Sequence, residues 1–138
     1  MRARQERAHE IDRGLGRYAE KLSRFVWPWP ESRLLVMVFV VAISDFLSTY
    51  LVLTFKNNAY ESGSVAQWAL DKGGFFLLLG VDLMVAGVLS LAAIGIRSFY
   101  ARIKVQGYGR AAFVFILIPY ACFAAFAVAN NIILLFRG

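Results

Sequence analysis

Two aspartates lie in the middle of the most apolar stretches of the chain. Asp45 lies within residues 34–55 and Asp82 within residues 75–96. An ionisable side chain at bilayer depth costs from about 3 to more than 10 kcal/mol, so a partner or a function must compensate for it. One interpretation is a proton or cation relay, because two carboxyl groups in a low-dielectric site can share a proton. The other is that each aspartate is protonated or bonded to a neighbouring helix and fixes how the helices pack.

The spacing of these residues allows the two carboxyl groups to meet. Counting about 1.5 Å per helical residue from the end of each stretch with more basic flanks gives depths of about 16 Å for Asp45 and about 21 Å for Asp82. The two depths are within one helical turn. Ser48 and Thr49 follow Asp45 by three and four residues and therefore share its helical face. Two phenols are further candidate donors, depending on helix rotation: Tyr50 and Tyr120.

The chain offers no evident set of catalytic or metal-binding residues. Its one histidine, His9, lies in the polar leading segment, and its one cysteine, Cys122, has no second cysteine to pair with. No phosphate loop follows a strand, and no nucleophile stands beside a base. Asp45, Asp82 and Cys122 would make a poor ligand set of mixed softness. We therefore expect no catalytic residue, no metal and no cofactor in this chain.

Three apolar stretches are long enough to cross a hydrocarbon core of about 30 Å as helices: residues 34–55, 75–96 and 111–136. Hydrophobic residues make up 59% of the 138, and no stretch shows the alternation of a barrel strand. A helix satisfies its own backbone hydrogen bonds in lipid. The sequence predicts an all-α integral membrane protein, with a cytoplasmic tail over residues 1–33 and a three-helix transmembrane domain over residues 34–138.

The basic residues predict the orientation in the cell membrane. Eight of the fifteen precede the first span, and four more lie between the second and third spans. By the positive-inside rule, we expect the amino terminus and the second loop to be cytoplasmic and the carboxyl terminus to be outside. Since these residues flank spans, we attribute the net charge of +6 to topology and to anionic lipid headgroups, and we expect no binding to nucleic acid.

The tail has the pattern of an amphipathic helix, with apolar residues spaced by four, three, four and three: Ile11, Leu15, Tyr18, Leu22 and Phe25. Such a stripe can lie at the acyl boundary of the membrane surface or dock on a soluble domain of a partner, and the sequence leaves both open. Gly14 and Gly16 weaken the helix, each by about 1 kcal/mol relative to alanine.

Tryptophans are expected to mark the two membrane faces. Trp27 and Trp29 alternate with two prolines, which predicts a corner pinned at the interface before the first span. In the first loop, Trp68 belongs to a segment at helical spacing that ends at Gly73 and Gly74. We therefore expect a short interfacial helix on the opposite face, with Trp68 as its anchor.

Small residues predict where the helices approach one another. One face of the second span is expected to carry Asp82, Ala86, Ser90, Ala93 and Arg97. The third span carries a predicted stripe of Ala121, Ala125 and Ala129, a kink at Pro119, and two amides near its outer end, Asn130 and Asn131. Each span thus has a face suited to protein contact.

Several of these features together carry a resemblance. Ile43-Ser44-Asp45 with Ser48-Thr49, then Glu61-Ser62, then Asn130-Asn131 resemble an uncharacterised family of small three-helix membrane proteins. In length, number of spans and basic leading tail, the chain also looks like the small extra subunit that accompanies archaeal membrane ammonia monooxygenase. The second resemblance implies an accessory chain packed against copper-bearing subunits, and it transfers no catalytic residue to this chain.

We therefore expect a non-catalytic accessory subunit of a larger integral-membrane enzyme complex, with other membrane subunits as partners and the ammonia and methane type of copper monooxygenase as one such complex. The alternative is a small homo-oligomeric transporter or channel that uses Asp45 and Asp82 to handle protons or cations. Both hypotheses require the same fold, so the composition of the native assembly distinguishes them.

Overall fold

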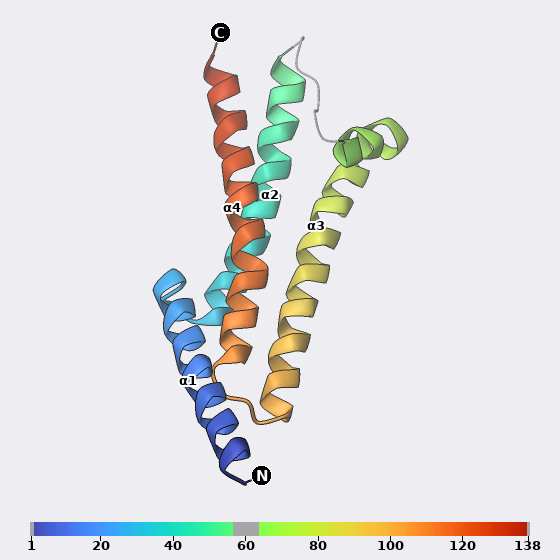
Figure 1. Ribbon diagram of the computed structural model, residues 1–138. Coiled ribbons are helices and arrows are strands. Elements are labelled where there is room, and N and C mark those ends of the chain that lie inside the picture. Colours follow the sequence, from blue (N-terminus) through green and yellow to red (C-terminus); the bar gives the residue numbers. More distant parts are fainter. Residues whose placement is uncertain (1, 57–63, 138) are drawn as a thin grey trace.

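The computed structural model describes residues 2–56 and 64–137, with side chains from residue 10 onward. The described residues form four helices: α1 (Arg2–Val26), α2 (Glu31–Phe55), α3 (Ser64–Arg102) and α4 (Tyr108–Phe136). In Figure 1, α2, α3 and α4 run side by side as an elongated bundle, and α1 lies along its lower end. The predicted all-α class is confirmed.

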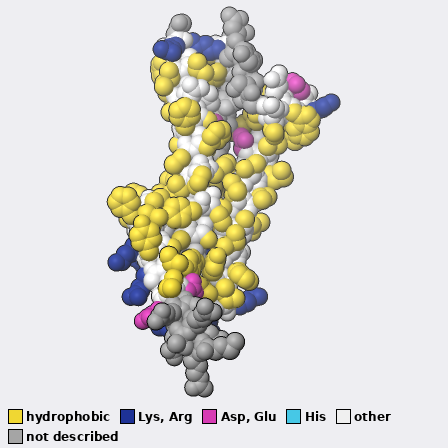
Figure 2. Space-filling view, in the orientation of Figure 1, with side chains coloured by type: hydrophobic (Ala, Val, Ile, Leu, Met, Phe, Trp, Pro, Cys, Tyr) yellow, Lys and Arg dark blue, Asp and Glu magenta, His cyan; other side chains and the backbone are white. Residues whose placement is uncertain are grey.

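Helices α2, α3 and α4 are each long and apolar enough to cross a membrane. The chain is thus an integral membrane protein, and the three predicted spans are confirmed, with α2 beginning three residues earlier than expected, at Glu31. Figure 2 shows a broad apolar band, with the Lys and Arg side chains of this face gathered toward the two ends. We call the end where α2 begins, α3 ends and α4 begins the basic end.

Helix α4 is the centre of the bundle, because it packs against each of the other three helices. Its residues Phe113, Val114 and Leu117 are almost completely buried, and they meet Leu34 and Val38 of α2. Ala86 and Ala93 of α3 join the same core. Lipid provides no hydrophobic force between helices, so close packing of this kind has to supply the association.

Helix α3 has two parts that meet at Gly74. This residue has φ 62° and ψ −156°, a conformation essentially restricted to glycine, and it turns the chain sharply. Figure 1 shows the segment before Gly74 turned aside at the upper end of α3, while the rest of α3 runs along the bundle. Trp68 is half exposed on this short segment and Ala69 is buried beneath it. The predicted short helix ending at the glycines is confirmed.

Helix α1 is held against the start of α4 by a close backbone approach. A side chain at Gly16 would collide with the carbonyl oxygen of Gln106, and one at Gly107 would collide with the Gly16 carbonyl. Nearby, the Tyr108 hydroxyl donates a hydrogen bond to Asp12 Oδ1 over 3.2 Å. The apolar stripe from Ile11 to Phe25 faces away from this contact and is exposed. Gly16 therefore has a packing role that outweighs its low helix propensity.

This contact predicts opposite effects for two glycines of α1. Gly16→Ala is expected to loosen α1, at a cost of about 1–3 kcal/mol for overpacking, and to raise the rate of tryptic cleavage after Arg17 and Arg24 several-fold. Gly14→Ala is the matched control, since nothing lies within 4 Å of a side chain there. It is expected to stabilise α1 by up to about 1 kcal/mol. Equal proteolysis rates in the two variants would contradict this account.

Candidate functional site

The three membrane helices bring polar groups together within the bundle. Asp45 on α2, Asp82 on α3 and Tyr120 on α4 are all partly buried. The Tyr120 phenol lies close enough to both carboxyl groups for their charges to act on it. Neither aspartate is without an interaction in the chain. Each helix thus contributes one ionisable group to the same neighbourhood, which the sequence allowed but left dependent on helix rotation.

A second polar contact joins α2 to α4 nearer the end opposite the basic one. The Asn131 amide nitrogen donates to Ser48 Oγ and to Thr49 Oγ1, each over 3.0 Å. Ser48 Oγ in turn donates to the backbone carbonyl of Asp45 over 3.0 Å. Ser48 and Thr49 are both buried. They share a face with Asp45 as expected, and the structure adds that their hydroxyl groups bind an amide from α4.

An acidic residue organises the basic end. Glu31 forms ion pairs with Arg97 of α3 and, over 3.5 Å, with Arg110 of α4, and its side chain is 11% exposed. Arg110 also donates to the carbonyl oxygens of Trp27 and Trp29, over 2.7 and 3.0 Å. The beginnings of α2 and α4 and the end of α3 are thus tied together. Glu31 was not among the site residues predicted from the sequence, although an acidic residue between a basic tail and a span was an available signal.

The small-residue faces agree only in part with the prediction. Ala86, Ser90 and Ala93 are buried, and the Ser90 hydroxyl has no hydrogen-bond partner among the described residues. On α4 the predicted stripe is out of register, because Ala121 is buried while Ala125 and Ala129 are exposed. Ala124 is buried in their place. The predicted stripe assumed steps of four residues throughout. The buried residues of α4 step by four from Leu117 to Ala121 and then by three to Ala124.

Of the three tryptophans expected at the membrane faces, one is buried and two are exposed. Trp27 is buried, packs edge to face on Trp29 at 4.9 Å, and donates from Nε1 to the Pro30 carbonyl over 3.2 Å. Trp29 and Trp68 are about half exposed, as headgroup anchors require. Asn130 is exposed, in contrast to Asn131. Two positions quoted for the family resemblance, Glu61 and Ser62, lie outside the described residues.

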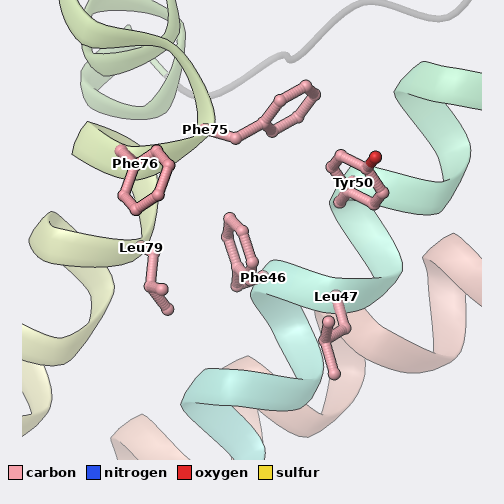
Figure 3. Close-up of a pocket in the computed structure, with 6 residues that line it drawn as sticks. All are labelled: Phe46, Leu47, Tyr50, Phe75, Phe76 and Leu79. Atoms are coloured by element: carbon pink, nitrogen blue, oxygen red, sulfur yellow. The ribbon is translucent and has the colours of Figure 1, made fainter.

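An apolar pocket of about 340 Å³, absent from the sequence analysis, lies between α2 and α3. In Figure 3 its lining side chains come from two helices: Phe46, Leu47 and Tyr50 from α2, and Phe75, Phe76 and Leu79 from α3. The Tyr50 and Phe75 rings meet edge to face at 4.7 Å. Phe75 and Phe76 directly follow the turn at Gly74, which places their rings beside α2. Such a lining offers contacts to apolar groups.

In the part of the chain that the structure describes, no group of three or more His, Cys, Asp or Glu residues is placed to hold a metal ion. Cys122 is a free, exposed cysteine. The polar groups that the structure does bring together are hydrogen-bonding and ion-pairing groups on neighbouring helices. They are suited to fixing helix positions.

Comparison with protein-family models, with curated proteins and with solved structures finds no match for this chain.

The amide contact predicts a difference between two adjacent asparagines. Asn131→Ala is expected to lower the free energy of unfolding by about 1–2 kcal/mol, because two interhelical hydrogen bonds are lost and the Thr49 hydroxyl loses its donor. Asn130→Ala is the matched control and should change it by less than about 0.5 kcal/mol. Both are measured by denaturant titration in mixed micelles, followed by circular dichroism. A larger loss for Asn130→Ala would refute the assigned contact.

Proposed function

We propose that the chain is a non-catalytic accessory subunit of a larger integral-membrane enzyme complex. The observation that carries the proposal is the outer face of α4, formed by Cys122, Ala125 and Ala129. These three small residues follow one another at spacings of three and four, and all are exposed in the chain. Small residues at this spacing allow another helix to approach closely, which is how helices associate in lipid.

The surroundings of this face support the same role. Phe126 and Ile133 adjoin it and are 73% and 54% exposed, so they extend the apolar surface that a partner helix can cover. Helix α1 lies along the lower end of the bundle and leaves the far half of α4 uncovered (Figure 1). The exposed stripe of α1 is a second apolar surface, available to the membrane or to a soluble domain of the same partner.

The orientation and the kind of complex belong to the same proposal. By the positive-inside rule the basic end faces the cytoplasm and the carboxyl terminus lies outside. The resemblance to the small extra subunit of archaeal ammonia monooxygenase suggests a membrane copper monooxygenase of the ammonia and methane type. In such a complex the metal and the catalytic residues would belong to other subunits, and this chain would contribute packing.

A second candidate function is favoured by one specific contact, the neighbourhood of Asp45, Asp82 and Tyr120. Two carboxyl groups and a phenol from three different helices are a plausible path for a proton or a cation. In that case the chain would assemble with copies of itself, and the ionisable groups would conduct across the bundle. The two candidates therefore differ in which polypeptide covers α4.

Photo-crosslinking from the outer face of α4 tests the proposal. Replacing Phe126 with the photoreactive residue benzoylphenylalanine places a probe beside Ala125 and Ala129 without adding bulk to the small residues themselves. Irradiation of native membranes should join this chain to a different polypeptide, detected by mass spectrometry. The same replacement at Val40, which is 54% exposed on α2, is the matched control and should give adducts with lipid. Adducts only with a second copy of this chain would contradict the proposal.

A further inference from the structure

Two adjoining clefts lie at the basic end, between α1 and the turn that joins α3 to α4. The first encloses about 710 Å³ and is lined by Arg13 and Arg17 of α1 and by Lys104 and Gln106 of the turn, together with neighbouring residues. The second encloses about 490 Å³ and extends toward Glu31. They share four lining residues, namely Glu20, Val105, Gln106 and Gly107. They therefore form one continuous polar depression.

Positively charged side chains outnumber negatively charged ones in this depression. Six basic and three acidic side chains line the two clefts. Two of the acidic groups are already paired with cations, since Glu31 pairs with Arg97 and Arg110 and Glu20 pairs with Arg24 over 3.0 Å. Asp12 accepts a hydrogen bond from the neutral Tyr108 hydroxyl and keeps its charge. Among the described residues, three cations of the first cleft have no ion pair: Arg13, Arg17 and Lys104. Against these three, Asp12 is the one unpaired carboxylate among the described lining residues, so the first cleft carries a surplus of positive charge.

The frame around these cations is fixed by the backbone. Lys104 has φ 58°, an uncommon conformation for a residue with a side chain, and its turn is closed by the hydrogen bond from Lys104 N to the Ala101 carbonyl over 3.2 Å. The close approach of Gly16 to Gln106, a residue that lines the cleft, holds α1 against the turn. The three cations are thus carried by two elements that are locked together, as a preformed anion site requires.

We propose that the first cleft binds a phosphate-bearing anion, held by Arg13, Arg17 and Lys104. A guanidinium group donates two parallel hydrogen bonds to phosphate oxygens, and an ammonium adds a mobile point charge. The Arg17 Nε donates to the Arg13 carbonyl, which leaves its two terminal nitrogens for a ligand. The cleft lies at the basic end of the bundle, so the phosphate comes either from a lipid headgroup or from solution.

Two charge-matched triple variants test the site in the full-length protein in a neutral detergent. The first removes the cleft cations, as Arg13→Gln, Arg17→Gln and Lys104→Gln. The second removes three exposed cations outside both clefts, as Lys21→Gln, Arg33→Gln and Arg102→Gln. The probes are dioctanoyl phosphatidylglycerol, followed by native mass spectrometry, and inorganic phosphate, followed by calorimetry. The cleft triple should weaken binding at least tenfold, and the control triple by no more than about twofold.

The probe that binds identifies the source of the phosphate. Phosphatidylglycerol alone points to a lipid headgroup, and inorganic phosphate binding with the same dependence on the cleft points to a soluble anion. The variant Arg13→Lys, Arg17→Lys and Lys104→Arg keeps the charges and should retain most of the binding, which separates loss of the site from loss of the fold. Equal weakening in both glutamine triples, or no binding of either probe to the unmodified protein, would overturn the proposal.

Discussion

Polar groups at bilayer depth must find their partners within protein, because hydrocarbon offers none. Helix α4 supplies such partners to α2. Its Asn131 donates to the hydroxyl groups of α2 and its Tyr120 lies near both aspartates, while at the basic end its Arg110 binds Glu31 and the carbonyl oxygens of the tryptophan corner. These contacts are distributed along the length of the helix. They help to hold α2 and α3 against α4, and close packing of the three helices stabilises the bundle further.

At the basic end, ion pairs and a close backbone contact hold the helices together outside the hydrocarbon. Glu31 pairs with one arginine from each of two helices, and Gly16 lets α1 lie against the turn before α4. Arg13, Arg17 and Lys104 then line one cleft, while the apolar stripe of α1 is exposed. Helix α1 thus carries a protein contact, an exposed apolar stripe and two of the cations of that cleft.

The fold could be predicted from the sequence where composition alone decides it. The three spans, the corner at Trp27 and the helix that ends before Gly74 all follow from length, tryptophan and proline placement, and glycine. The rotation of each helix could not be predicted, because a span that meets lipid on one side and protein on the other is apolar on both. For that reason Ala124 is buried where Ala125 was expected, and the partner of Asn131 was not foreseen. Gly16 depends on a tertiary contact that has no local signal.

We propose that a different protein covers this chain in its native membrane. The most direct test is to purify the tagged chain from native membranes in a mild detergent and to determine the composition and stoichiometry of the particle by mass spectrometry. The account predicts larger, different membrane subunits in a fixed ratio to this chain. A stable particle that contains only copies of this chain would contradict it and would leave Asp45, Asp82 and Tyr120 as the groups to explain.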